Sequence, residues 1–274
     1  LENIRNIETL DTFISQLLSQ TRKSIFGTVE TVYFDVERQS IKDEPLLGER
    51  MAKQFVNRYP FAILKNNHQI LSDLRSVKHE EEVNLTKEAI RISTLANDHL
   101  LTKLKYAKTE FELEAEYNYV LNMNNTTPSF SSIIASGKNA TILHYENNDM
   151  PLHKGDLVLF DLGVRYKQYA SDISRTYPIS GKFTDRQKEV YQAVLNVNKE
   201  IIKWVKPGVT QFEYNQKGVE LLTKEAKRIG LIQNDKEITK YYYHGLGHPL
   251  GMDVHDASDP SKAFKVGQII TVEA

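Results

Sequence analysis

The segments Gly-Asp-Leu-Val-Leu-Phe-Asp at positions 155–161 and Ser-Asp-Ile-Ser-Arg-Thr-Tyr at positions 171–177 carry the pattern around which this chain is organised. Both are rich in β-branched and aromatic residues, which is typical of strands. A turn centred just after Tyr166 would join them into a hairpin and place Asp161 opposite Asp172. The Cβ atoms of cross-strand partners lie roughly 4.5–5.5 Å apart, and like charges at that distance repel. The two aspartates therefore need a shared proton or a cation, and we expect a cation.

The composition is that of a globular protein with a large core. The 274 residues are 40% hydrophobic and 26% charged, which fits one large domain or one and a half. The net charge of -1 argues against a role with nucleic acid or a membrane surface that rests on bulk charge. We find no signal peptide and no long apolar run, so we expect a cytoplasmic protein.

The chain has no cysteine, so disulfides, thiolate metal sites and cysteine nucleophiles are excluded. Any metal must then be held by histidines and carboxylates. The sequence begins with Leu1 and ends in Thr-Val-Glu-Ala, which reads like a strand cut in mid-course. We expect further sequence at both ends.

The N-terminal part reads as a small α/β piece. Apolar residues have helical spacing over 8–20, and residues 28–37 and 61–64 have the composition of strands. The charged run at 78–82 then opens a long helix, and we expect it to be a solvated first turn. We therefore predict two domains, residues 1–75 and 76–274.

After this boundary one order of elements occurs twice, namely two helices and then strands. Thr109 with Glu112 forms a capping-box pattern for the second helix, and extended segments follow, among them residues 141–145. Thr184 with Gln187 and Thr210 with Glu213 cap the next two helices. The sequence thus predicts an α+β fold with a pseudo-twofold repeat.

The strands of the two halves also correspond. Residues 266–273 mirror residues 154–161, with a glycine six positions before an acid in both. A histidine precedes each segment, His144 in one half and His255 in the other. By this symmetry Glu273 should have a partner acid on a returning strand, which the sequence does not reach.

Histidines are concentrated in the segment 241–256, which holds three of the eight in the chain, His244, His248 and His255. Interspersed glycines and a proline prevent a regular helix, so irregular backbone must place them. An isolated histidine is more often a structural residue than a ligand. A cluster beside two carboxylates favours a functional site.

Together Asp161, Asp172, His248 and Glu273 offer several oxygen ligands and one imidazole, which suit Mn²⁺, Co²⁺ or Zn²⁺. Several carboxylates indicate two ions that share a water and polarise a carbonyl, as in hydrolysis without a side-chain nucleophile. The structural alternative makes Asp161 a strand-end turn residue and pairs Asp172 with Arg175.

Taken together, these motifs resemble the pita-bread metallopeptidases, specifically the branch of aminopeptidase P and prolidase. The similar stretches include Ile-Leu-His-Tyr at 142–145, Asp-Leu-Gly at 161–163, His-Gly-Leu-Gly-His at 244–248 and Val-His-Asp at 254–256. The resemblance spans about residues 75–274. It implies the pita-bread (creatinase/aminopeptidase) fold, and residues 1–75 resemble the end of the family's creatinase-like N-terminal domain.

The resemblance also implies residue roles. Asp161, Asp172, His248 and Glu273 match four of five ligands of two divalent ions, with Mn²⁺ the expected metal. Glu273 would also handle the proton of the attacking hydroxide that bridges the ions. His144, His244 and His255 match the outer histidines, which contact substrate and stabilise the tetrahedral intermediate. Ala274 stands where the family pattern has proline, and a chain that ended before the fifth ligand would be inactive.

The activity that this resemblance implies is that of an Xaa-Pro aminopeptidase, which removes the first residue of a peptide with proline in second place. A prolidase, which acts on Xaa-Pro dipeptides, is the near alternative. A methionine aminopeptidase fits less well because of the additional N-terminal region. From a different class, the chain could be a non-catalytic, metal-free peptide-binding module. A peptide substrate and a homodimer are the expected partners, without nucleic acid or membrane.

Overall fold

The computed structural model describes residues 6–18, 27–37 and 44–274. The chain divides into two compact units, Leu1–Ser72 and Asp73–Ala274. In the described part of the chain, no helix has the length and apolar character needed to cross a membrane.

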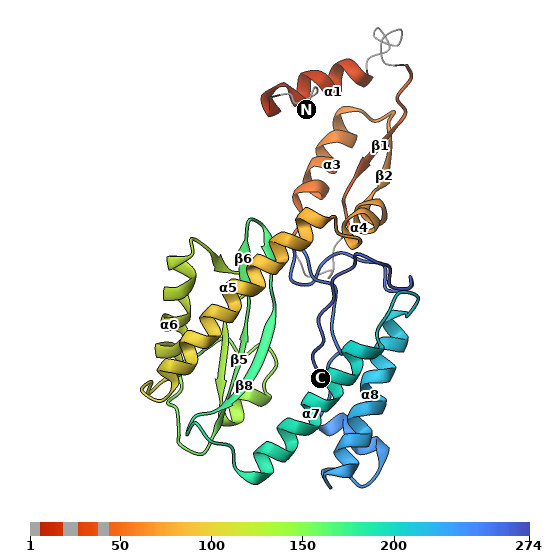
Figure 1. The fold of residues 1–274 in the computed structure, drawn as a ribbon. Coiled ribbons are helices and arrows are strands. Elements are labelled where there is room, and N and C mark those ends of the chain that lie inside the picture. Colours follow the sequence, from red (N-terminus) through yellow and green to blue (C-terminus); the bar gives the residue numbers. More distant parts are fainter. Residues whose placement is uncertain (1–5, 19–26, 38–43) are drawn as a thin grey trace. The chain divides into compact units, whose positions relative to one another are not determined.

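The N-terminal unit contains a parallel pair of short strands, β1 (Thr31–Phe34) and β2 (Ile63–Asn66). The helix α3 (Leu47–Arg58) lies beside β1 (Figure 1). The ring centroids of Phe34 and Phe55 are 5.4 Å apart. The remaining described helices are η1 (Ile7–Thr9), α1 (Leu10–Leu18) and α4 (His68–Ser76), of which α4 continues past the end of the unit. Positions 19 and 20 of the predicted helix lie outside the described residues.

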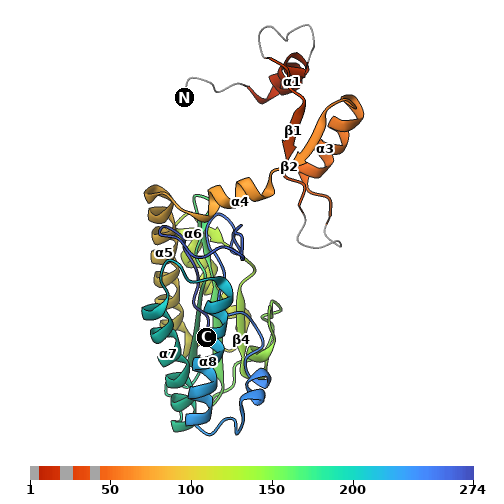
Figure 2. The ribbon, with the colours of Figure 1, turned by 90° about the vertical axis from the view of Figure 1, so that its right-hand side faces the viewer.

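The larger unit has four long helices and two three-stranded antiparallel sheets. Figures 1 and 2 show the helix pair α5–α6 followed along the chain by the pair α7–α8. The long helices are α5 (Glu80–Leu104), α6 (Glu110–Met123), α7 (Asp185–Trp204) and α8 (Gln211–Arg228), with short 3-10 helices η3 (Gly137–Thr141) and η4 (Asp235–Lys240). One sheet contains β4 (Ile133–Ser136), β5 (Leu157–Leu162) and β8 (Ile173–Pro178), and the other β3 (Thr127–Pro128), β6 (Val164–Tyr166) and β7 (Tyr169–Ala170).

The alternation of side chains along β5 determines on which face of the sheet Asp161 lies. Val158, Phe160 and Leu162 are fully buried in the core that α5 and α6 form on one face of the sheet. Because successive side chains of a strand point to opposite faces, Leu159 and Asp161 lie on the other face. The second core joins α7 and α8 to the C-terminal segment through Ile270 and Val272.

The hairpin register differs from the prediction by two residues. Asp161 pairs with Ser174, and the turn residues are Lys167 and Gln168 rather than those around Tyr166. Both turn residues have positive φ (45° and 74°), as the twist-matched two-residue hairpin turn requires. A shift of two residues preserves the face, so Asp172 still lies on the side of Asp161, as a diagonal neighbour.

The repeat is visible in matched backbone contacts. Isolated bridges join the residue before α6 to Pro151 and the residue before α8 to Ala263. Gly155 and Gly267 both have positive φ, and each lies six residues before its acid. The second half is less regular than predicted, because residues 266–273 form no assigned strand. Residues 141–145 are not extended either, since η3 and a turn occupy this place.

Two of the three predicted capping boxes form. Thr184 and Gln187 exchange hydrogen bonds at the start of α7, and Thr210 and Glu213 do so at the start of α8. The prediction for Thr109 is wrong, because its hydroxyl makes no cap hydrogen bond and is buried without a partner.

Replacement by alanine should therefore affect the free energy of unfolding differently at Thr184 and at Thr109. Thr184→Ala should lower the free energy of unfolding by about 1 kcal/mol, since it removes a formed N-cap. Thr109→Ala should cost less, because its hydroxyl forms no bond to lose. Urea unfolding followed by circular dichroism measures both. An equal loss in the two variants would contradict the capping assignment.

The charged run that opens α5 is only partly solvated, which corrects the prediction for Lys78. Its side chain is 1% exposed, and its ammonium group lies 2.7 Å from the carboxylate of Asp256, which is equally buried. Arg75 also pairs with Asp256, and with Asp253 at 2.6 Å. This ion cluster, in which Lys78 and Asp256 are buried, connects the start of α5 to the segment that contains His255.

Candidate metal centre

The histidine-rich segment lies antiparallel to the segment that ends at Glu273. The amides of Thr271 and Glu273 donate to the carbonyls of His248 and Leu246 at 2.9 and 2.7 Å. Gly247 permits this approach, because a Cβ there would overlap the carbonyl of Thr271. As predicted, glycines and irregular backbone place these histidines.

Three predicted ligands from distant parts of the sequence meet at one point. One ligand atom from each of Asp172, His248 and Glu273 lies within 4.8 Å of the others. Nε2 of His248 is 3.3 Å from Oδ2 of Asp172 and 3.2 Å from Oε1 of Glu273. The side chains are 10–29% exposed, so the group is largely buried but still accessible to solvent.

Asp161 lies beside this group but outside it. Its carboxylate accepts a hydrogen bond from Ser174 at 2.9 Å. Burial and the negative charges of Asp172 and Glu273 raise the pKa of Asp161 to about 6. Such mutual destabilisation of carboxylates is what a bound cation relieves. The alternative pairing of Asp172 with Arg175 is not seen, since Arg175 donates to the carbonyl of Ser174.

The charges of His248 and Glu273 support each other. Burial disfavours the imidazolium of His248, but hydrogen bonding to Asp172 and Glu273 outweighs it and raises its pKa to about 10. Burial also disfavours the carboxylate of Glu273, but His248 and Thr271 outweigh it and lower the pKa of Glu273. Oε1 of Glu273 is nevertheless buried without a well-aligned hydrogen bond. Two carboxylates and an imidazole that converge on one point fit a divalent cation.

The three outer histidines are all exposed and lie near this group. The ring of His255 lies 4.1 Å from that of His248, and burial together with His248 lowers the pKa of His255. His244 is exposed and packs edge-on against Tyr242 at 4.7 Å. His144 is exposed in the turn after η3, has φ 55°, and interacts electrostatically with Asp161.

Sequence reasoning missed the residues that hold the ligands in place. Thr271 donates its amide to the carbonyl of His248, and its hydroxyl accepts from the amide of His248 at 3.0 Å. Ser171, fully buried beside Asp172, bonds to Ser93 of α5 at 2.6 Å. The position of each beside a ligand was the only available signal, because their partners are far away in the sequence.

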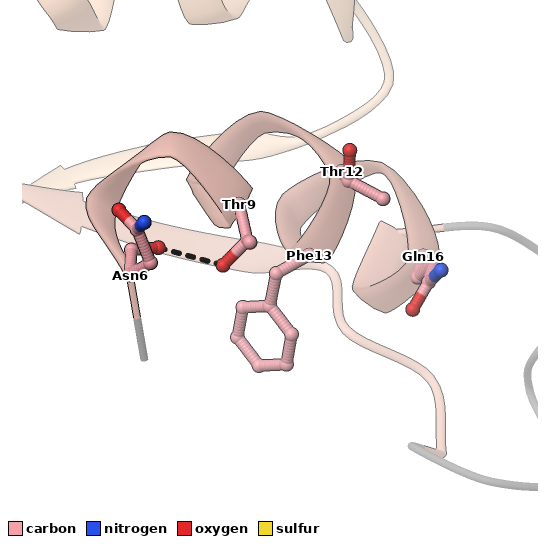
Figure 3. Close-up of a pocket in the computed structure, with 5 residues that line it drawn as sticks. All are labelled: Asn6, Thr9, Thr12, Phe13 and Gln16. Atoms are coloured by element: carbon pink, nitrogen blue, oxygen red, sulfur yellow. Dashed lines mark hydrogen bonds between the residues drawn. The ribbon is translucent and has the colours of Figure 1, made fainter. Parts of the chain in front are cut away.

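A separate hollow lies along α1 in the N-terminal unit (Figure 3). Its lining is Asn6, Thr9, Thr12, Phe13 and Gln16, and the hydroxyl of Thr9 donates to the carbonyl of Asn6 at 2.7 Å. The lining contains no titratable or metal-ligating side chain, so this hollow offers no chemistry comparable to the carboxylate–histidine group.

We predict that metal binding at this group releases protons. Metal ligation needs a neutral imidazole, whereas His248 with a pKa of about 10 holds a proton at neutral pH. About one proton per chain should be released near pH 8, and affinity should rise about tenfold per pH unit up to about pH 10. Below about pH 6 the dependence should steepen, since Asp161 is then protonated as well. Calorimetric titration with Mn²⁺ in buffers of different ionisation enthalpy measures this release. Affinity that is constant from pH 7 to 9 would contradict the assignment of His248.

The chain is similar to proteins of one known family. Residues 84–274 match the model of metallopeptidase family M24. A Xaa-Pro aminopeptidase of Haemophilus influenzae is 36% identical over 216 residues, which are 74% of this chain and 50% of that protein. The chain thus spans about half the length of this curated relative.

Solved structures agree. The structure of a putative aminopeptidase P from Bacillus anthracis has a TM-score of 0.88 and 36% identity over 97% of this chain and 62% of that one. Zn-substituted Escherichia coli aminopeptidase P in complex with product has a TM-score of 0.78 and 26% identity, again over 97% and 62%. These matches confirm the predicted α+β pita-bread fold and the aminopeptidase P branch. The chain belongs to metallopeptidase family M24.

Proposed function

We propose that this chain carries the catalytic centre of an Xaa-Pro aminopeptidase, which hydrolyses the bond between the first residue of a peptide and a proline in second place. The observation that supports this most is the convergence of Asp172, His248 and Glu273 in a chain of a metallopeptidase family. The curated relative of Haemophilus influenzae bears the name of this activity.

We propose Asp161, Asp172, His248 and Glu273 as ligands of two divalent ions, with Mn²⁺ as the native metal and Co²⁺ or Zn²⁺ as alternatives. The convergence of two carboxylates and one imidazole supports the fit. Such ions, when bound, provide Lewis acidity that lowers the pKa of water and polarises a carbonyl.

The side chains would then do the following work. Glu273 would take the proton of the attacking water and pass it to the leaving amine, since its lowered pKa keeps it a carboxylate at neutral pH. His144, His244 and His255 would hold the peptide and stabilise the oxyanion of the tetrahedral intermediate. The partial closure of the group against solvent would strengthen these electrostatic interactions.

An assay of the full-length protein, which would supply the fifth ligand that the resemblance implies, tests this proposal. It compares a tripeptide Xaa-Pro-Yaa with the dipeptide Xaa-Pro in excess Mn²⁺. Cleavage of the tripeptide is the expected result. Cleavage of the dipeptide alone would assign the chain to the prolidases instead. Absence of both turnover and bound metal would favour a non-catalytic peptide-binding module.

Further parts of the proposal concern the context of the centre. We propose that residues 1–75 are the end of a creatinase-like N-terminal domain and residues 76–274 the pita-bread domain. We also propose a cytoplasmic homodimer that acts on peptides and binds neither nucleic acid nor membrane. The near-neutral charge of -1 supports the last point.

A further inference from the structure

Glu110, the first residue of α6, is a fully buried carboxylate outside the candidate metal centre. It accepts hydrogen bonds from the amide and the hydroxyl of Ser136, both at 2.7 Å. It also accepts from the hydroxyl of Tyr145 at 2.7 Å, the amide of Met150 at 3.1 Å and the side-chain amide of Asn139 at 3.3 Å. Five donors therefore converge on one side chain.

All five donors belong to one segment, residues 136–150, which contains His144. Beyond η3 this segment has little regular structure of its own, so few backbone bonds hold it. The donors flank His144 on both sides, and Tyr145 follows it directly. Glu110 thus fixes the segment before and after the histidine.

The conformation of His144 needs such support. Its φ of 55° lies in the left-handed region, which non-glycine residues adopt at an energetic cost. A single residue keeps such a conformation only when its surroundings determine it. Release of the segment from Glu110 would remove part of that support.

A carboxylate suits this task better than its amide. Burial alone disfavours the charge, but hydrogen bonds from Ser136, Tyr145 and Met150 outweigh it and lower the pKa of Glu110. An ionised carboxylate only accepts hydrogen bonds, whereas glutamine would turn two N–H donors toward these donors. The substitution Glu110→Gln therefore keeps the shape of the side chain but places N–H donors where acceptors are needed.

A second buried polar side chain holds the same segment. Asn148 is 1% exposed, accepts from the amide of Ile134 in β4 at 2.9 Å and donates to the carbonyl of Ser132 at 2.8 Å. This contact orients the segment against the sheet whose next strand bears Asp161. The place of His144 is thereby set relative to Asp161, with which it interacts electrostatically.

We propose that Glu110 is a positioning residue for the reaction: it sets His144 in place by binding the segment 136–150 from both sides. The expected fall in kcat/KM rests on the proposed function. The expected change in hydrogen exchange does not, so each can fail without the other.

Glu110→Gln tests the proposal in two ways. Hydrogen exchange is expected to quicken at least about tenfold at the amides of Ser136 and Met150, whereas the amides of α5 keep their protection. The value of kcat/KM should fall about 10–100-fold, as for other residues that orient a functional side chain, while calorimetry shows unchanged Mn²⁺ binding. In a His144→Ala background the same substitution should change kcat/KM less than about twofold, because its effect passes through the histidine.

Glu116→Gln is the matched control, since Glu116 lies on the same helix and pairs only with His99 and Lys103 near the surface. It should leave both exchange and kinetics unchanged. Tyr145→Phe removes one of the five donors and should give a weaker form of the same result if Glu110→Gln does not fold.

Unchanged exchange in residues 136–150 would overturn the proposal, as would an equal kinetic loss with and without His144. The kinetics are measured on the full-length protein. If neither this parent protein nor any variant cleaves a peptide, the proposed function fails, and the exchange experiment still decides the role of Glu110.

Discussion

Asp172→Ala is expected to abolish metal-dependent turnover and to leave the helices folded. Asp172 lies next to His248 and is the diagonal neighbour of Asp161, whose pKa it helps to raise. Its loss removes a ligand and the partner of the His248 imidazolium. A bound divalent ion provides several kcal/mol of transition-state stabilisation, so turnover should fall about a thousandfold or more.

Three measurements distinguish this effect from unfolding. Far-ultraviolet circular dichroism should be unchanged, calorimetry should show weakened Mn²⁺ binding, and peptide cleavage should be lost. Asp98→Ala is the control, because Asp98 is an exposed aspartate on α5. Retained turnover in Asp172→Ala would contradict the ligand assignment.

Local patterns in the sequence predicted those features that depend on neighbouring residues. The composition of residues 155–161 and 171–177 predicted the strands β5 and β8, and the caps of α7 and α8 form as their residue types indicate. Periodicity and capping act within a few residues, so one segment contains the whole signal. The composition of residues 241–256 likewise predicted irregular backbone around the histidines.

The hairpin register could not be obtained in this way. Two-residue turns with positive φ are usually marked by asparagine, aspartate or glycine, and here they contain Lys167 and Gln168. The sequence around the turn therefore offered no local marker. Asp172 remained on the correct face only because the error was an even number of residues.

Other errors arose from partners that are distant in sequence. The capping-box pattern at Thr109 fails because Glu112 instead accepts from the amide of Lys108, and the neighbouring Glu110 binds residues 26–40 positions away. Lys78 is buried because its partner Asp256 follows 178 positions later. No short stretch of sequence contains both members of such a pair. The residues that support the site can therefore be identified only in the folded structure.

Lys78→Met is expected to lower the free energy of unfolding by about 3–5 kcal/mol. Removal of one member of a buried ion pair leaves the other charge without compensation. Asp256 would keep its contact with Arg75, which favours the lower end of this range. Urea unfolding can be followed through Trp204, the single tryptophan, which packs against the core of α7 and α8.

Two further variants test whether the buried pair Lys78–Asp256 causes this loss of stability. Lys262→Met breaks an exposed pair with Asp73 and should cost less than about 1 kcal/mol. The double variant Lys78→Met with Asp256→Leu removes both buried charges and should be more stable than Lys78→Met alone, since neither charge is left unpaired.

Because Asp256 directly follows His255, the single variant Lys78→Met should also weaken Mn²⁺ binding at His248, which packs against His255. A loss of stability as small as that of Lys262→Met would show that the cluster does not hold this segment.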